Sequence, residues 1–201
     1  MARGLRLTRP WLIVAALAAA GALPAWFADP AALDWQPGRW PAQPWRAVTA
    51  AWVHLSALHL GANLVGAALV AALGEVAGCG RRAALAWALA WPLTHLALAL
   101  QPALQHYGGL SGLMHAGVAV AAWQLLRAER GRRRAVGAAL LAGMTIKLLL
   151  EAPWLGPLRQ VPGWDIPIAP LAHTSGALAG LLCAWACGVG GDAARGRPPS
   201  T

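Results

Sequence analysis

Six long apolar stretches follow one another along this chain, separated by short segments rich in arginine, glycine or proline. A stretch of roughly 20 mostly apolar residues can cross the hydrocarbon core of a bilayer, which is about 30 Å thick. The candidate spans are residues 11–28, 47–74, 83–103, 110–126, 135–152 and 169–188. We therefore expect an all-α membrane protein, built as one six-helix transmembrane domain over residues 1–201, with a short tail over residues 189–201.

The composition supports this fold class. Only 11% of the 201 residues are charged and 58% are hydrophobic, whereas about a quarter of a soluble domain is charged. The same values exclude a disordered chain. Three cysteines are too few for a disulfide framework in a chain of this length.

The arginines define an orientation. With a cytoplasmic N-terminus, twelve of the fifteen arginines fall in inner segments, and only Arg39, Arg46 and Arg159 fall in outer loops. This is a strong positive-inside pattern, and it places both termini in the cytoplasm. The net charge of +9 is then explained by topology. We expect the lipid bilayer, and not a nucleic acid, to be the partner of these charges.

The first stretch has a second interpretation, as a cleaved signal peptide, because arginines precede its apolar run. We favour a retained helix, since Trp26 and Phe27 occupy the place where cleavage would be expected.

Polar side chains inside spans are costly and mark functional sites. All four aspartates lie outside the spans, which excludes an intramembrane aspartyl protease. No His-Glu-x-x-His motif occurs, which argues against a zinc protease, and we expect no metal or cofactor. A transporter or channel would need a polar path along a whole helix face, but the polar residues stop at mid-depth. Those in the spans are His54, His59, Asn63, His95, Ser111, His115, Lys147, Glu151 and His173.

Ser111 lies between glycines at the start of an apolar helix, in the run Gly108-Gly109-Leu110-Ser111-Gly112. Glycines let a substrate backbone approach closely, and a helix N-terminus offers free N–H groups to a developing oxyanion. Such a short motif is weak alone, because small residues also serve helix packing.

His173 is the candidate base for Ser111. Gly176 and Gly180 follow it on one helix face, where they allow another helix to come very close. A single intramembrane histidine is commonly satisfied by a backbone carbonyl. The presence of a serine on another span favours instead a two-residue version of the serine hydrolase arrangement.

The candidate residues also share a depth. In this topology the second, fourth and sixth spans all run inward, and one residue adds 1.5 Å. The separations to the inner charges are 16, 16 and 19 residues, or roughly 24 to 28 Å: Ser111 to Arg127, His59 to Glu75, and His173 to Asp192. These three residues can therefore share one site, with Asn63 one turn below His59. The Asn63 amide, the His59 imidazole and the backbone N–H groups of Ser111 and its neighbour Leu110 are the available oxyanion donors.

At these residues the chain resembles the rhomboid family of intramembrane serine proteases. The resemblance rests on Trp45-Arg46, His54 with His59 and Asn63, Gly109-Leu110-Ser111-Gly112, and His173 with Gly176 and Gly180, in family order on three spans. It covers nearly the whole chain. It implies Ser111 as nucleophile, His173 as general base, and His59 and Asn63 as oxyanion contributors.

Within that family the chain looks most like rhombosortases, on its length and on His115 in Gly-Leu-Ser-Gly-Leu-Met-His. This branch implies cleavage of membrane-anchored substrates at a C-terminal signal of Gly-Gly, transmembrane segment and basic tail. It also implies the bacterial inner membrane, with the site opening to the periplasm. The alternatives are a general rhomboid protease that cuts helix-destabilised segments, and a non-cleaving rhomboid-like protein that binds clients.

The remaining polar residues receive secondary roles. Gly109, Gly112 and His115 are candidates for tuning the site, although His115 could equally serve packing. Lys147 and Glu151 are four residues apart, so we expect them to pair, without a catalytic role. His54, His95 and His106 are interpreted as interfacial or helix-contacting residues. Trp154 and Trp164 could line an outer cap over the site.

Overall fold

The structure is a computed structural model that describes residues 2–191, with side chains from Arg9 onward. No β-strand forms within these residues. The long helices are α1 (Ala2–Ala25), α4 (Ala57–Ala77), α5 (Arg81–Leu96), α6 (Ser111–Ala128), α7 (Gly131–Glu151) and α8 (Pro170–Ala186). The connections hold the short helices α2 (Pro30–Leu33), α3 (Arg46–Thr49), η1 (Ala50–Trp52) and η2 (Ala97–Leu100).

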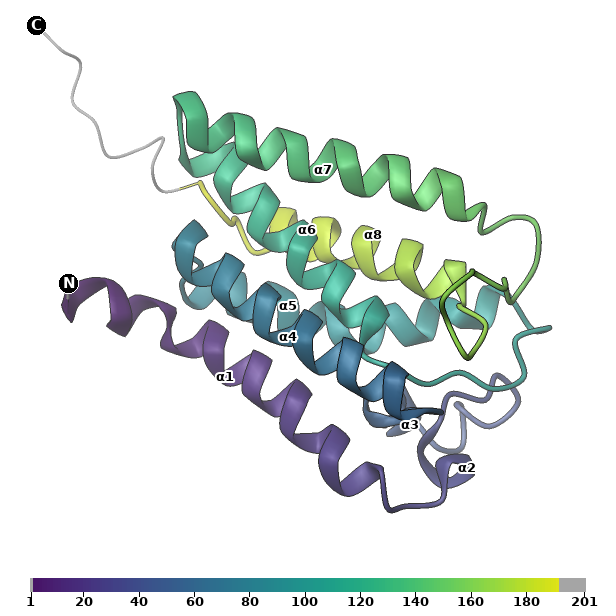
Figure 1. The fold of residues 1–201 in the computed structure, drawn as a ribbon. Coiled ribbons are helices and arrows are strands. Elements are labelled where there is room, and N and C mark those ends of the chain that lie inside the picture. Colours follow the sequence, from purple (N-terminus) through teal and green to yellow (C-terminus); the bar gives the residue numbers. More distant parts are fainter. Residues whose placement is uncertain (1, 192–201) are drawn as a thin grey trace, which may run out of the picture.

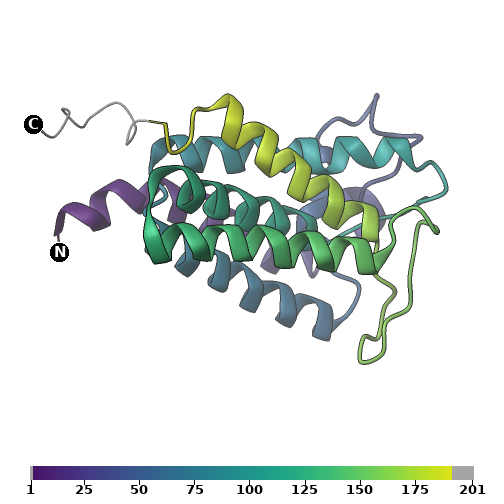
Figure 2. The same cartoon turned by 90° about the horizontal axis from the view of Figure 1, so that it is seen from above.

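Helix α6 lies at the centre of the bundle and packs against α4, α5, α7 and α8 (Figures 1 and 2). Its inward positions are fully buried apolar residues such as Leu113, Ala116 and Val120. Because the side chains on this face are mostly small, several helices can approach α6 at once. The first residue of α6, Ser111, is therefore surrounded by neighbouring helices.

The close approach predicted for Gly176 and Gly180 is confirmed. A Cβ atom built on Gly176 would lie 2.0 Å from the carbonyl oxygen of Gly112, and one on Gly180 would lie 2.5 Å from that of Ala116. No side chain fits into such gaps, so α8 contacts the backbone of α6 directly. The two helices that carry Ser111 and His173 can thus pack in direct backbone contact, because no side chain lies between them at the two glycines.

The span predicted over residues 47–74 is not one helix. The chain forms α3 and η1, then runs through an irregular segment over residues 53–56, and α4 begins only at Ala57. The hydroxyl of Ser56 accepts a hydrogen bond from the backbone N–H of His59, which caps the new helix. Hydropathy measures apolarity and not conformation, so the continuous apolar run hid this break.

The other predicted spans fall on long helices, with shifted ends. The segment 83–103 is divided between α5 and η2 and ends in a turn. Among the residues that the structure describes, two segments are long and apolar enough to cross a membrane by themselves, namely Ala57–Ala77 and Arg81–Leu100. The number of spans therefore stays a prediction for the other helices.

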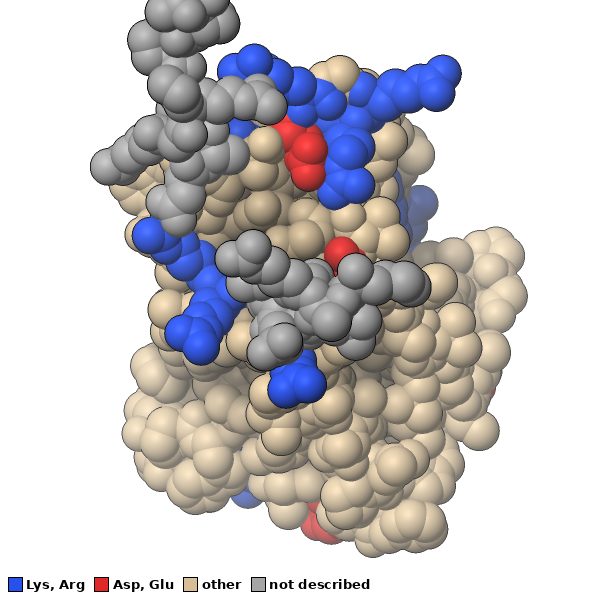
Figure 3. All heavy atoms as spheres, turned by 90° about the vertical axis from the view of Figure 1, so that its left-hand side faces the viewer, with Lys and Arg blue, Asp and Glu red and all other residues tan. Residues whose placement is uncertain are grey.

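One end of the bundle carries most of the charge. Helix α1 begins and α8 ends at this end (Figure 1), and Figure 3 shows Lys and Arg side chains gathered there. The first turns of α5 and α7 and the last turn of α6 supply arginines to it. Ser111 begins α6 and lies at the opposite end. Of the predicted tail over residues 189–201, the part from residue 192 onward, with Arg195 and Arg197, lies outside the described residues.

Candidate active site

The loop before α6 places Ser111 at the mouth of the bundle. Gly109 has φ +131°, a conformation that L side chains rarely adopt. A Cβ atom on Gly109 would lie 2.7 Å from His59 Nε2. Both observations require glycine at this position, and they place the His59 ring directly against the loop that precedes the serine.

Backbone contacts hold this loop in place. The backbone N–H of Gly109 donates to the carbonyl of Ala50 (2.9 Å), and Trp35 and Tyr107 exchange two backbone hydrogen bonds. The Tyr107 hydroxyl donates to the Gly109 carbonyl at 3.2 Å. Burial raises the pKa of Tyr107, so this hydroxyl keeps the proton that it donates. The position of Ser111 is therefore defined before any substrate arrives.

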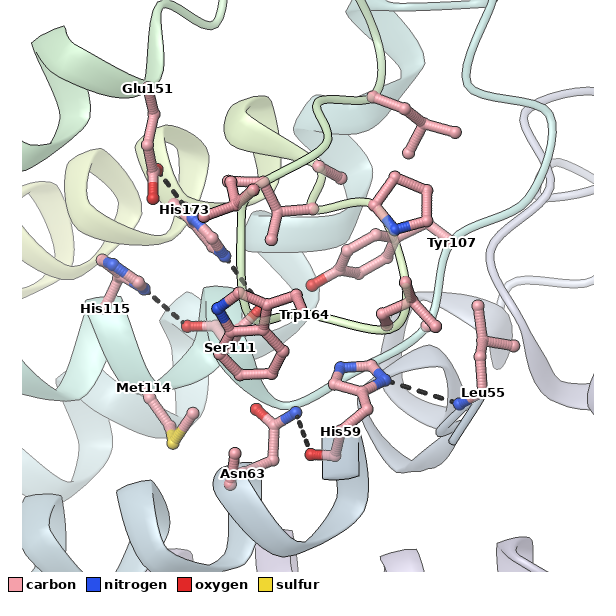
Figure 4. Close-up of a pocket in the computed structure, with 18 of the residues that line it drawn as sticks. Leu55, His59, Asn63, Tyr107, Ser111, Met114, His115, Glu151, Trp164 and His173 are labelled. Carbon is pink, nitrogen blue, oxygen red and sulfur yellow. Dashed lines mark hydrogen bonds and ion pairs between the residues drawn. The ribbon is translucent and has the colours of Figure 1, made fainter. Parts of the chain in front are cut away.

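His173 lies in the first turn of α8 and faces Ser111 (Figure 4). The distance between His173 Nε2 and Ser111 Oγ is 3.0 Å, which is hydrogen-bond distance. The two residues are 62 positions apart in the chain, and the glycine contacts between α6 and α8 bring them together. The predicted proximity of serine and histidine is thus present in the structure.

The second nitrogen of the same ring contacts a carboxylate. His173 Nδ1 lies 2.7 Å from Oε2 of Glu151, the last residue of α7. The other carboxylate oxygen of Glu151 accepts a hydrogen bond from Lys147 at 2.5 Å. The predicted Lys147–Glu151 pair is present, but the contact of Glu151 with His173 was missed.

A signal for Glu151 was present in the sequence. Glu151 follows Arg134 by seventeen positions, or about 25 Å of helix, which is the same depth as Ser111 by the same measure. The local pair with Lys147 is enough to explain a charged Glu151 in the sequence, so the pattern alone does not indicate the longer-range partner.

His59 presents a donor to the site. The backbone N–H of Leu55 donates to His59 Nδ1 at 3.4 Å, so the proton of the neutral ring lies on Nε2. That Nε2 atom is the one that faces Gly109. The His59 ring also packs against the His54 ring at a tilt of 57°, with 4.8 Å between ring centroids. The ring is therefore oriented by its neighbours, with an N–H group toward the cavity beside Ser111.

Asn63 lies one turn below His59 and also lines the cavity. Its Nδ2 atom donates one hydrogen bond to the carbonyl of His59 at 2.9 Å, and its buried Oδ1 atom has no protein partner. An amide nitrogen carries two hydrogens, so one donor remains. The Asn63 side chain is thus held in place with one N–H group unused.

The other predicted residues differ in their surroundings. The Leu110 side chain is fully buried, and this residue precedes the first turn of α6, where backbone N–H groups have no intrahelical acceptor. Gly112 does not line the cavity, because its Cα faces the backbone of Ala172. His115 donates from Nδ1 to the Ser111 carbonyl at 2.7 Å, and its ring stacks on His173 with 4.4 Å between centroids.

A cavity of about 480 Å³ opens in front of Ser111. The loop between α7 and α8 covers it with apolar side chains, among them Leu158, Val161 and Trp164. Asp165 in this loop accepts a hydrogen bond from the Ser56 hydroxyl at 2.8 Å, which ties the loop to the start of α4. Trp164 therefore covers the site as expected, whereas Trp154 is 66% exposed and does not line the cavity.

The remaining histidines bond to groups other than Ser111, although His106 also lines the cavity. His95 is buried, and its Nδ1 atom donates to the Ala47 carbonyl at 2.7 Å, the helix-contacting role expected for it. His106 contacts Asp34, which also pairs with the buried Arg46. Within residues 2–191, no group of three or more His, Cys, Asp or Glu side chains could hold a metal ion.

The structure thus defines a helical bundle with a serine, a histidine and a glutamate in hydrogen-bonded sequence beneath an apolar loop. Residues 41–189 match the Rhomboid domain family. Because this match covers well over half of the chain, the chain belongs to the rhomboid family, whose members are in general intramembrane serine proteases. Membership also means that the chain is a membrane protein. The comparison with curated proteins found no match.

Proposed function

We propose that this chain is an intramembrane serine endopeptidase that uses Ser111 as nucleophile and His173 as general base. The observation that carries the proposal is the 3.0 Å contact between His173 Nε2 and Ser111 Oγ at the cavity wall. His173 accepts the hydroxyl proton as Ser111 attacks the peptide carbonyl, and then gives it to the leaving amine. Water hydrolyses the resulting acyl-enzyme ester and regenerates the serine.

The tetrahedral intermediate needs donors for its oxyanion. His59 Nε2–H and the free Nδ2 hydrogen of Asn63 approach the cavity from α4. The first-turn N–H groups around Leu110 and Ser111 approach it from α6. Donors on two sides of the serine would surround the developing charge, and loss of one such donor typically costs about 10²- to 10³-fold in turnover.

We further propose a substrate class, that of membrane-anchored proteins with a C-terminal Gly-Gly, transmembrane segment and basic tail. Such a tail favours the cytoplasmic side. The Gly-Gly pair would then lie at the outer end of the substrate helix. Ser111 is the first residue of α6, and α6 begins at the end of the bundle opposite the arginine-rich end (Figure 1), which suits this orientation. The protease would act at the bacterial inner membrane, with its site open to the periplasm.

The position of His115 favours this branch over a general rhomboid protease. Its ring stacks on His173, and its Nδ1 atom holds the carbonyl of Ser111. The residue that marks the branch in the sequence is thus in direct contact with both proposed catalytic residues. A non-cleaving client-binding role is the second alternative, and the intact set of Ser111, His173 and Asn63 argues against it.

Cleavage of a reporter in cells tests the proposal. The reporter is a secreted domain followed by Gly-Gly, an apolar span and an arginine tail, coexpressed with wild-type, Ser111→Ala or Thr145→Ala protease. Thr145 is exposed, and its hydroxyl donates to the Leu141 carbonyl within α7. We expect the wild type and Thr145→Ala to release the domain, and Ser111→Ala to leave it membrane-bound. Unchanged cleavage by Ser111→Ala would overturn the mechanism. Equal cleavage of a reporter with Val-Val in place of Gly-Gly would return the substrate class to that of a general rhomboid.

A further inference from the structure

We infer that Glu151 is a positioning residue for His173, so that the site works as a three-residue chain and not as a dyad. The inference rests on the proposed function of Ser111 and His173. The observation behind it is that both ring nitrogens of His173 are engaged, Nδ1 by Glu151 Oε2 at 2.7 Å and Nε2 by Ser111 Oγ at 3.0 Å.

The carboxylate determines which nitrogen of His173 carries the proton. An ionised carboxylate only accepts hydrogen bonds, so Nδ1 must be the donor in this contact. In the neutral ring Nε2 then has a free lone pair, and the Ser111 hydroxyl donates to it. Without Glu151 the ring could adopt the other tautomer, in which Nε2 carries a hydrogen and cannot accept the serine proton.

The same carboxylate balances charge during the reaction. When His173 takes the proton of Ser111 it becomes a cation, and Glu151 lies against it as an anion at hydrogen-bond distance. Charge-assisted hydrogen bonds of this kind are roughly twice as strong as neutral ones. Glu151 therefore favours the protonated ring at the moment when the oxyanion forms.

Lys147 holds Glu151 in this position. Its ammonium group donates to Oε1, and the ring of His173 contacts Oε2, so the two oxygens of one carboxylate serve different partners. Lys147 is 47% exposed, whereas the Glu151 side chain is only 14% exposed. The lysine thus contacts the half-buried carboxylate from the exposed side of the cavity and fixes the rotation of the carboxylate.

The other groups around His173 cannot replace Glu151. His115 stacks on the ring face and uses its own Nδ1 atom for the Ser111 carbonyl. His59 faces Gly109 from the other side of the serine. Along the described residues, Glu151 is the one carboxylate bonded to His173. This makes Glu151→Gln a selective change, because glutamine has nearly the same shape but no charge.

The test compares Glu151→Gln with Glu129→Gln in the purified full chain. Glu129 also forms an ion pair with a residue four positions along the chain, Arg133 at 3.0 Å. Glu129 directly follows α6 and precedes α7, whereas Glu151 is the last residue of α7. The readout is the rate at which a fluorophosphonate probe labels Ser111, which needs no knowledge of the natural substrate. Thermal melting of each variant reports whether the fold is retained.

We expect Glu151→Gln to slow labelling by about 10²- to 10⁴-fold, as loss of an orienting carboxylate does in serine hydrolases. Glu129→Gln should label at the wild-type rate, and Glu151→Asp should label at least tenfold faster than Glu151→Gln. With the Gly-Gly reporter, the Glu151→Gln loss should fall on kcat and leave KM within about twofold.

Two results would overturn the inference. One is labelling of Glu151→Gln within about twofold of the wild type. The other is equal loss in Glu151→Gln and Glu151→Asp when both melt as the wild type does. Failure of the proposed function itself would look different, because Ser111→Ala would then still cleave the reporter.

Discussion

Helices α7 and α8 pack against the same central helix α6, yet they are held in different ways. Along α8 nearly every inward residue is buried, and Gly176 contacts the α6 backbone without an intervening side chain. Along α7 the structure shows only Gly137 and Met144 as buried. Gly137 contacts α6 closely near the arginine-rich end, whereas a Cβ on Gly143 would meet no atom within 4 Å.

Because of this difference in packing, His173 on α8 and Glu151 on α7 are held with different tightness. The base, His173, is fixed by the tightest helix contact in the site, and its distance to Ser111 follows from backbone packing. The carboxylate that orients the base lies at the less tightly packed end of α7, where its contacts with His173 and Lys147 hold it. A displacement of α7 would therefore change the activity of the base without moving the nucleophile.

The largest effect should come from breaking the α6–α8 contact. In Gly176→Ala the new methyl group would lie 2.0 Å from the Gly112 oxygen, so the helices must separate. We expect a loss of about 3 kcal/mol in unfolding free energy, at the upper end of overpacking costs, together with loss of cleavage. Gly143→Ala on α7 is the matched control, and it should be neutral or up to about 1 kcal/mol more stable. Denaturation in detergent measures both, and equal effects would refute the contrast.

The loop before α6 belongs to the tightly packed half of the site. Gly109→Ala would strain a backbone at φ +131° and push its methyl group into His59 Nε2. We expect cleavage to fall by about 10²-fold, the cost of one displaced oxyanion donor. Gly78→Ala shares the positive φ but meets no atom within 4 Å, so it should cleave normally. Steady-state kinetics of the two variants decides this, and normal turnover by Gly109→Ala would remove His59 from the site.

The α7–α8 loop belongs to the looser half. Asp165→Ala removes the hydrogen bond to Ser56, which is worth about 1 kcal/mol, so hydrogen exchange in residues 158–168 should speed up roughly fivefold. Asp29→Ala, which removes an exposed cap of α2, should leave exchange in that loop unchanged. Unaltered hydrogen exchange in Asp165→Ala would mean that apolar contacts alone hold the α7–α8 loop over the cavity.

The smallest effect concerns Lys147. Lys147→Met leaves the Glu151 charge in place but frees its rotation, so we expect labelling of Ser111 to slow only about two- to fivefold. Arg133→Met removes the corresponding partner of Glu129 and should have no effect on labelling. A loss as large as that of Glu151→Gln would indicate that the lysine, and not the glutamate, positions the base.

The depth of each residue in the membrane could be predicted from the sequence. A helix rises 1.5 Å per residue, so the number of residues to the charges at the inner end of a span gives the depth. The shared height predicted for Ser111, His59 and His173 agrees with their positions around one cavity. The rotation of each helix about its own axis could not be predicted, because it depends on which neighbouring helix packs against which of its faces. For this reason Glu151 was assigned to a local pair, although its height matches that of Ser111.

The residue at which a helix begins also could not be predicted from hydropathy. The apolar residues before Ser56 continue the pattern of α4, and only the capping hydroxyl marks the true start. Gly112 and Gly109 look alike in the motif, yet one packs on Ala172 and the other on His59. These distinctions depend on backbone conformation and on neighbours distant in the chain.

The most direct test of the central claim is to identify the residue that a fluorophosphonate probe modifies. The purified chain is labelled in lipid vesicles, digested and mapped by mass spectrometry, beside His173→Ala. We predict a single adduct at Ser111 in the wild type and labelling at least 10²-fold slower in His173→Ala, because the base is lost. An adduct on another residue, or equal labelling of Ser111 in His173→Ala, would contradict the account.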